Sequence, residues 1–385
     1  MLLIQNGILH TMEPEGTYPG DLLIADGKIL QLGAHLPAPE SARRFDASGL
    51  HLYPGILDAH SHIGISEEKV GIQGDDCNEG TNPVTPCLRA IDAINPMDSA
   101  FHNALAAGIT GAMIGPGSAN VVGGQFAFVK TAGRRIDDMV VLAPAAIKVA
   151  FGENPKGNYG LNGNMPATRM GIASLLREQL FQARQYLQQT SPAPDFEKES
   201  YRPLFEGAIP LKAHVHRTDD IFTAIRIAKE FGLGLTLDHC TEGHLIADAI
   251  AKSGFPAIVG PSLASRSKIE VELSDFKTAG VLDRAGVLVA ITTDHPVTRI
   301  QHLPLCAALA AKKGMAEEAA LRAITINAAR ICRVDDRLGS LKEGKDADLA
   351  LFDGSPLVIK SEVLLTLVNG EPAYQAPGAA QRFSA

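Results

Sequence analysis

Between about residue 55 and residue 342 the chain repeats one pattern, a short apolar run typical of a strand followed by an amphipathic stretch typical of a helix. A helix between two strands carries the chain back to the edge at which the next strand begins, so the repeat predicts a parallel sheet. So many units in one uninterrupted stretch favour a closed (β/α)8 TIM barrel. An open, doubly wound sheet is the alternative, but no GxGxxG motif follows an early strand.

The apolar runs predict seven barrel strands, at residues 55–59, 109–114, 146–150, 210–214, 234–239, 257–261 and 287–293. We expect the eighth between Gln125 and Ala143, as a hairpin or an irregular strand. Helices are predicted between the strands, among them residues 99–107, 168–189, 219–231, 245–253 and 304–313. The predicted fold class is therefore α/β.

The two ends of the chain differ from the middle, because short apolar runs alternate there with tight turns. Asp26-Gly27 near one end and Asn369-Gly370 near the other are hairpin signals. Neither end has enough strands for a stable sheet of its own. We therefore expect one small, β-sandwich-like domain built from residues 1–54 and 343–385, with the barrel of residues 55–342 inserted between its halves.

The first predicted barrel strand ends in Asp58, His60 and His62, within the segment LYPGILDAHSHIG. Successive strand side chains alternate between two faces, so both imidazoles point the same way and can bind one metal ion. Histidines with this spacing are also found as simple polar groups at strand ends, so the motif needs further ligands from elsewhere in the chain.

Later predicted strands also end in groups able to bind or bridge a divalent cation. Lys148 lies in AIKVAFGENP, His214 and His216 end LKAHVH, His239 ends LTLDH, and Asp294 follows LVAITT. In a barrel the carboxyl ends of the strands meet at one face, where TIM-barrel enzymes carry their active sites. These side chains are therefore expected to converge on one site.

This mixture of side chains suits a catalytic metal. Neutral imidazole and carboxylate are ligands for zinc and similar metals, and a catalytic site leaves one position for water. The metal lowers the pKa of that water and generates hydroxide near neutral pH. Asp294 can accept the water's proton and later return it to a leaving nitrogen.

Several of these residues also have a structural interpretation. We favour His214 as a ligand and His216 as a substrate contact or a polar group on the rim. His239 can be an ordinary polar residue at a strand end. Asp294 lies two residues before a proline and can cap a turn.

A lysine in the apolar strand around position 148 is costly to bury unless it is paired or chemically altered. Glu153, five residues further on, can neutralise Lys148 without any metal. Arg169 begins a long predicted helix and is a candidate for holding a substrate carboxylate, although a solvated surface arginine is the default interpretation.

The charge balance excludes several classes of partner. The chain has 35 basic and 43 acidic residues, a net charge of −8, with no dense stripe of lysine or arginine, so we expect neither nucleic acid nor an anionic membrane as partner. Five scattered cysteines without a CxxC pair are typical of a reduced, cytoplasmic chain. No apolar run approaches the ~20 residues of a membrane-spanning helix. We expect a cytoplasmic homo-oligomer that acts on a small molecule.

The order of these motifs resembles the amidohydrolase superfamily. PGILDAHSHIG is similar to its first-strand metal motif, and KAHVH, LDHCTEGH and TTDHP are similar to its fifth-, sixth- and eighth-strand motifs. The tail LGSLKEGKDADLALFD, followed by VLLTLVNGE, is similar to the return of the chain into the family's small β domain. The resemblance spans nearly the whole chain and is nearest to the imidazolonepropionase-related and prolidase-like members.

The resemblance implies a set of ligands. His60 and His62 are expected to bind the more buried metal ion, with Asp294 as ligand and proton shuttle. In a member with two metals, His214 and His239 bind the second ion. In a member with one metal, His214 completes the site and His239 touches the substrate.

The resemblance also implies a bridge between two metals. Lys148 matches a lysine that is carbamylated in some relatives and bridges the ions, and Glu153 is the alternative bridge. The expected cofactors are thus one or two divalent ions, with zinc as first choice and iron or manganese as alternatives.

Together these expectations describe a metal-dependent hydrolase in which hydroxide attacks a carbonyl or amidine carbon and a C–N bond breaks. An amide, a cyclic amide or a dipeptide-like molecule is the first choice of substrate, and deamination of a ring amidine is the alternative. A non-catalytic scaffold with the same fold ranks lower, because such relatives typically lose metal ligands and this chain retains them.

Overall fold

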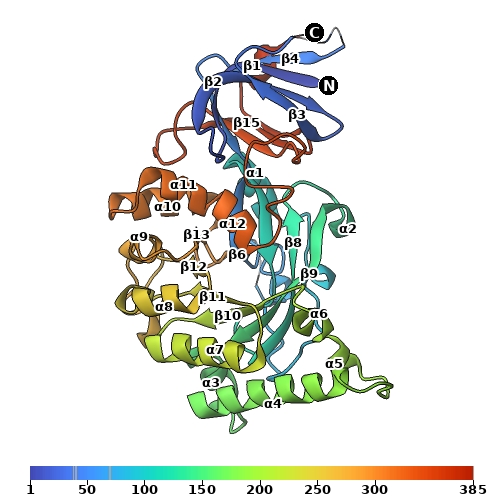
Figure 1. The fold of residues 1–385 in the computed structure, drawn as a ribbon, viewed down its shortest axis with the longest axis vertical. Coiled ribbons are helices and arrows are strands. Elements are labelled where there is room, and N and C mark those ends of the chain that lie inside the picture. Colours follow the sequence, from blue (N-terminus) through green and yellow to red (C-terminus); the bar gives the residue numbers. More distant parts are fainter. Residues whose placement is uncertain (38, 40, 69–70, 385) are drawn as a thin grey trace.

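Figure 1 shows two sheets, one above the other, in the computed structural model, which describes residues 1–37, 39, 41–68 and 71–384. An eight-stranded sheet forms a nearly closed barrel in the lower part of the view, with helices around it. A nine-stranded sheet from both ends of the chain, with blue and red strands, lies above it. The predicted fold class is confirmed. The domain boundaries after residues 54 and 342 stay a prediction.

The barrel strands follow one another around the sheet in their order along the chain. All seven strands predicted from the apolar runs are present, with small shifts at their ends except for β9, which begins at residue 140 instead of 146. The strands are β6 (Ile56–Ser61), β7 (Ile109–Ile114), β8 (Val122–Lys130), β9 (Val140–Ala150), β10 (Leu211–Val215), β11 (Leu235–His239), β12 (Ala257–Val259) and β13 (Val289–Ile291).

The eighth strand is β8, which runs antiparallel to both of its neighbours, so the barrel is not wholly parallel. The connections on either side of it explain this direction. Residues 115–121 join β7 to β8, and residues 131–139 join β8 to β9 with only a four-residue helix, α2 (Ile136–Met139). A parallel crossover needs a dozen or more residues, so the chain turns back instead.

Side-chain hydrogen bonds join the first and last strands of the barrel. The hydroxyl oxygen of Thr292 lies 2.6 Å from both Asp58 Oδ1 and the carbonyl oxygen of His60. The amide of Thr293 donates to Asp58 Oδ2 at 3.1 Å, and its hydroxyl donates to the same oxygen at 2.5 Å. The carboxylate of Asp58 therefore holds the barrel closed beneath the predicted metal ligands.

Helices cover the outside of the barrel. The long helix α4 (Arg169–Leu187) begins where the hydroxyl of Thr168 accepts a hydrogen bond from the amide of Gly171 at 3.0 Å. Among the described residues, no helix is both long and apolar enough to cross a membrane. The other helices are α1 (Ser99–Ala106), α3 (Glu153–Gly160), α5 (Phe196–Glu199), α6 (Arg202–Phe205), α7 (Thr218–Phe231), α8 (Ala247–Ser253), α9 (Lys277–Arg284), α10 (Leu303–Lys312), α11 (Glu317–Ala323) and α12 (Ile326–Ile331).

The second sheet is assembled from both ends of the chain, because β5 pairs with β1 on one side and β14 on the other. Asp26-Gly27 and Asn369-Gly370 form its predicted tight turns, and all four residues have positive φ. Many of its apolar side chains form a core of their own, whereas Tyr53, Ala350 and Phe352 pack with the core of the barrel. The strands are β1 (Leu2–His10), β2 (Thr17–Ala25), β3 (Lys28–Gly33), β4 (Arg43–Asp46), β5 (His51–Pro54), β14 (Leu349–Phe352), β15 (Val363–Val368), β16 (Glu371–Gln375) and β17 (Phe383–Ser384).

A buried lysine ties the barrel to the second sheet. Because β8 runs antiparallel, its last residue, Lys130, lies beside Gly111 near the start of β7. Its ammonium lies 2.7 Å from Asp346, 3.0 Å from Asp348 and 2.5 Å from the amide oxygen of Asn369. The reversed strand therefore places a charged group where the two sheets meet.

We expect Lys130→Met to lower the free energy of unfolding by about 3–5 kcal/mol, because it leaves the buried carboxylate of Asp348 without its cation. Lys28→Met is the matched control, since Lys28 also pairs with Asp346 but its side chain is 48% exposed. The control should cost less than about 1 kcal/mol. Urea denaturation measures both, and equal effects in the two variants would contradict the role of Lys130.

Candidate metal centre

A cavity of about 310 Å³ opens at the carboxyl ends of the parallel barrel strands. Loop residues and Asn154 of α3 form its polar outer wall, the loop residues including Ser66, Asn78, Ser118, Ser267 and Lys268. Six predicted site residues line it: His62, Lys148, His214, His216, His239 and Asp294. His60 is fully buried beside them. The structure thus brings the strand-end residues together, as the sequence predicted.

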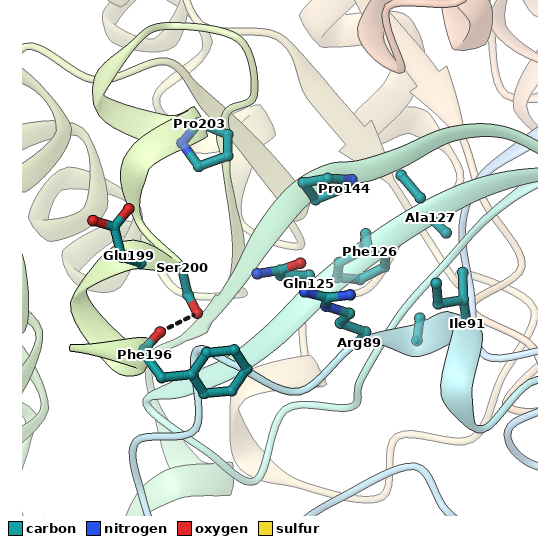
Figure 2. A pocket seen from close by; sticks show the side chains of 12 residues that line it. Arg89, Ile91, Gln125, Phe126, Ala127, Pro144, Phe196, Glu199, Ser200 and Pro203 are labelled. Carbon is teal, nitrogen blue, oxygen red and sulfur yellow. Dashed lines mark hydrogen bonds between the residues drawn. The ribbon is translucent and has the colours of Figure 1, made fainter. Parts of the chain in front are cut away.

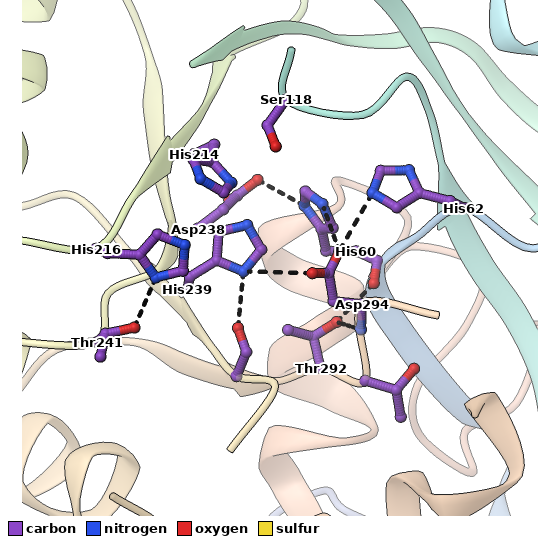
Figure 3. A network of polar contacts seen from close by, with 12 residues as sticks. His60, His62, Ser118, His214, His216, Asp238, His239, Thr241, Thr292 and Asp294 are labelled. Carbon is purple, nitrogen blue, oxygen red and sulfur yellow. Dashed lines mark hydrogen bonds and ion pairs between the residues drawn. The ribbon is translucent and has the colours of Figure 1, made fainter. Parts of the chain in front are cut away.

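His60, His62 and Asp294 form a first group of candidate ligands (Figure 3). Asp294 Oδ1 lies 3.4 Å from Nε2 of His60 and 3.2 Å from Nε2 of His62. The opposite ring nitrogens have partners of their own, since His60 Nδ1 lies 2.7 Å from Asp238 Oδ2 and His62 Nδ1 lies 2.6 Å from the carbonyl oxygen of Gly115. Such bonds at Nδ1 leave Nε2 of each ring free to bind a metal.

His214, His216 and His239 form a second group, in which the ligand nitrogens lie within 4.8 Å of one another. Nδ1 of His216 lies 2.7 Å from the hydroxyl of Thr241, and Nδ1 of His239 lies 2.8 Å from the carbonyl oxygen of Gly260. His239 also clusters with two residues of the first group, so one imidazole connects the two groups.

The two groups fit a divalent cation. Within the described residues, two buried atoms of this centre have no hydrogen-bond partner, Nε2 of His239 and Oδ1 of Asp294. Buried polar atoms are nearly always satisfied, so these two indicate a place for an ion. Burial lowers the pKa of His60 to about 3 and holds the pKa values of His214 and His216 well below 6.5. The rings of His60, His214 and His216 are therefore neutral, which is the form that binds metal. Burial also disfavours the charged form of His62, but Cys77 and Asp294 outweigh burial and raise the pKa of His62 to about 10.

Two of these residues adopt an unusual backbone conformation. His239 has a φ of 72° and Asp294 a φ of 52°, in the left-handed region that non-glycine residues rarely occupy. In a regular strand His239 and its neighbour Asp238 would face opposite sides. The left-handed turn at His239 breaks this alternation, so both side chains face the interior of the barrel (Figure 3).

Two buried lysines lie side by side within the barrel. Lys148 on β9 and Lys212 on β10 are direct partners in the sheet, and they expose 0% and 1% of their surface. Lys212 Nζ lies 3.1 Å from Asp238 Oδ2, whereas Lys148 forms no ion pair with any carboxylate of the described residues. Lys148 Nζ instead lies 3.4 Å from His60 Nε2, and burial lowers the pKa of Lys148 to about 8.

Asp238 is a functional candidate that the sequence analysis missed. Its Oδ1 accepts a hydrogen bond from the hydroxyl of Thr236 at 2.9 Å, and its Oδ2 faces both His60 and Lys212. Burial by itself raises the pKa of Asp238, but Lys212 and His60 outweigh burial and hold that pKa below its usual value. An aspartate before a histidine has no distinctive spacing, so the sequence contained no signal for this contact.

Glu153 does not contact Lys148 in the structure. Its carboxylate accepts a hydrogen bond from the amide of Glu270 at 3.2 Å, and the carboxylate of Glu270 accepts one from the amide of Glu153 at 2.8 Å. Glu270, also missed from sequence, is 1% exposed, and its Oε1 lies 3.8 Å from Nε2 of both His214 and His216. It comes from a loop between strands, where no periodicity marks it.

Arg169 is not among the residues that line the cavity in the described part of the chain. Its Nε lies 3.0 Å from both carboxylate oxygens of Asp220, in a half-buried ion pair. The structure therefore does not bring Arg169 to the metal centre.

Figure 2 shows another cavity, of about 290 Å³, between β8, β9 and α5. Arg89, Gln125, Phe196 and Glu199 lie around it, and none of the candidate ligands does. The chemistry predicted from the sequence therefore belongs to the cavity at the strand ends.

Comparison with known proteins places this geometry in a family. Residues 203–374 match the family model described as "Amidohydrolase family". The crystal structure of an amidohydrolase from Thermotoga maritima MSB8 is 38% identical, with a TM-score of 0.95, and the alignment covers 98% of this chain and 100% of that one. Amidohydrolase tasK of Hapsidospora irregularis is 28% identical over 97% of this chain but only 43% of its own length. Imidazolonepropionase of Mycolicibacterium smegmatis is 24% identical over 92% of this chain and 91% of its own.

The fold and site define a barrel hydrolase that acts on carbon–nitrogen bonds. The chain belongs to the amidohydrolase family, and the predicted resemblance is confirmed. This family is metal-dependent, which agrees with the histidine and aspartate clusters at the strand ends.

Proposed function

We propose that this chain uses a metal-activated water to hydrolyse a C–N bond of an amide, a cyclic amide or a dipeptide-like small molecule. The observation that carries the proposal is a pair of buried atoms, His239 Nε2 and Asp294 Oδ1, that make no hydrogen bond among the described residues. They lie among the candidate ligands, with Asp294 Oδ1 only 3.2 Å from Nε2 of His62. A divalent ion bound there lowers the pKa of its water toward neutrality and so supplies hydroxide.

His60 and His62 are proposed to hold the first ion through Nε2, together with Asp294. The carboxylate of Asp294 takes the proton of the attacking water and returns it to the leaving nitrogen, so that the amine leaves neutral. The support is its position, because Asp294 Oδ1 lies within 3.4 Å of both rings and its backbone aims it into the cavity.

His214 and His239 are proposed to hold a second ion, with a carbamylated Lys148 bridging the two. Lys148 is favoured over its buried neighbour Lys212, because Lys212 pairs with Asp238 while the amine of Lys148 has no carboxylate partner among the described residues. A buried ammonium without a counter-charge is costly, whereas a carbamate in the same place is an anion that metals bind.

The substrate is proposed to be small and polar. Serine and asparagine side chains from several loops line the outer cavity, and they offer both donors and acceptors to an amide group. His216 lies in the same wall, with Nδ1 held by Thr241, and is proposed to contact the substrate through Nε2. The position of Arg169, paired with Asp220, does not support a substrate contact for that residue.

Purified protein should carry about one or two equivalents of zinc, iron or manganese by elemental analysis. A chelator should abolish hydrolysis of a panel of N-acyl amino acids, dipeptides and cyclic amides, and added metal should restore it. Ammonia release would instead indicate deamination of a ring amidine. A folded preparation that contains no metal and takes none up would overturn the proposal.

Three finer expectations belong to the same proposal. Zinc is the first choice of metal, because imidazole and carboxylate dominate the donor set. A cytoplasmic location is supported by the five cysteines, which are all unpaired in the structure. A homo-oligomeric state stays a prediction.

A further inference from the structure

The interior of the barrel contains a chain of charged contacts that leads away from the metal centre. Nε2 of His60 faces the metal centre, and Nδ1 of the same ring lies 2.7 Å from Asp238 Oδ2. Asp238 in turn meets the ammonium of Lys212 at 3.1 Å. All three side chains are at least 98% buried, so water does not screen these contacts.

The positions of these residues in the sheet explain why they meet. Lys212 and His214 lie two residues apart on β10, so their side chains share one face and point into the barrel. Asp238 is the strand partner of His214 on β11. Asp238 therefore lies closer to the carboxyl ends of the strands than Lys212 does, next to the candidate ligands. The ring of Phe126 lies below both buried lysines, with its centroid 5.4 Å from Lys212 Nζ and 5.6 Å from Lys148 Nζ.

We propose that Lys212 is a positioning residue for the metal centre: it holds Asp238 as the acceptor for His60 Nδ1–H, so that Nε2 of His60 faces the metal. A carboxylate behind a metal-binding histidine fixes the ring orientation and tautomer. A buried carboxylate needs its own counter-charge, and among the described residues Lys212 is the one lysine that forms an ion pair with Asp238. The proposal rests on the proposed function, since it requires that His60 binds metal.

The neighbouring lysine serves as an internal contrast. Lys148 lies level with Lys212 in the sheet and above the same aromatic ring, but it has no carboxylate partner. The structure thus assigns different roles to two residues of the same type. Lys148 lies at the cavity wall, whereas Lys212 acts only through Asp238.

The test is a double-mutant cycle on metal affinity, measured by competition with a chromophoric chelator for Zn²⁺. Lys212→Met and Asp238→Asn should each weaken the affinity of the first site by about 10- to 100-fold. The double variant should lose no more than Asp238→Asn alone, because Lys212 acts through Asp238. Lys212→Arg keeps the charge and should recover most of the affinity.

A purely structural role is distinguished by the visible spectrum of the Co²⁺-loaded protein, which reports ligand geometry. The spectrum should change in Lys212→Met and return in Lys212→Arg. Lys229→Met, an exposed position on α7, is the matched control and should leave the spectrum unchanged.

The positioning role would be overturned if Lys212→Met bound Zn²⁺ with wild-type affinity. It would also be overturned if the double variant lost the sum of the affinity losses of the two single variants. If Lys212→Met does not fold, Asp238→Asn decides, because wild-type affinity in that variant contradicts the proposal. Failure of the wild-type protein to bind any metal is a different result and overturns the proposed function itself.

Discussion

Asp294→Asn should lower kcat by about 10²- to 10⁴-fold while most of the bound metal remains, because the amide keeps the shape of the side chain but cannot carry the proton. Asparagine also tolerates the left-handed backbone at this position, where φ is 52°, so the substitution should not strain the loop. Turnover of the best substrate in the panel and elemental analysis of the same preparation measure the two quantities.

Asp248→Asn is the matched control for this experiment. Asp248 lies on α8, its side chain is 78% exposed, and within the described part of the chain its one ion pair is with Lys252. Its substitution should leave both turnover and metal content at wild-type values. If Asp294→Asn retained activity comparable to the control, Asp294 would have no part in proton transfer. If Asp294→Asn lost the bound metal as well as activity, the main role of Asp294 would be that of a metal ligand.

Lys148→Ala should reduce the metal content from about two equivalents to one, because the bridging carbamate can no longer form. Elemental analysis gives the count. Growth with ¹³C-labelled bicarbonate and carbon NMR should show a carbamate signal in the wild-type protein and none in the variant. Lys148→Met fills more of the vacated space and should give the same count, which separates the loss of the bridge from a collapsed cavity.

Glu153→Gln tests the alternative bridge. Its carboxylate accepts a hydrogen bond from the amide of Glu270, so the variant should disturb that loop slightly and keep the metal count of the wild type. An unchanged count in Lys148→Ala together with a reduced count in Glu153→Gln would transfer the bridge to the glutamate.

Much of the barrel was predictable because its signals are local. The seven barrel strands other than β8, and the main helices, were predicted from apolar runs and periodicity. Both signals depend only on residues near one another in the chain. The direction of β8 was left open, because a hairpin and an irregular strand were both expected there; the structure has the hairpin, formed by β8 and β9. This direction depends on how little chain connects β7, β8 and β9, and the run GQFAFVKTAG does not itself reveal which way its strand points.

The site shows the same division. Strand-end histidines could be grouped from sequence, because a barrel brings the carboxyl ends of its strands to one face. The substrate role of Arg169 stays a prediction, and its neighbours in sequence do not reveal its ion pair with Asp220. Asp238, Lys212 and Glu270 were missed for a related reason, because each is defined by partners on other strands or loops.

The sequence alone thus determined the class of fold, the strand ends that meet and the residue types able to bind a metal, since strand alternation and barrel geometry follow from short-range patterns. Only the tertiary structure decided which charged groups pair. Lys148 and Lys212 look alike in sequence, yet one meets a carboxylate and the other does not. In a low-dielectric interior that pairing decides what each lysine can do, and it depends on segments far apart in the chain.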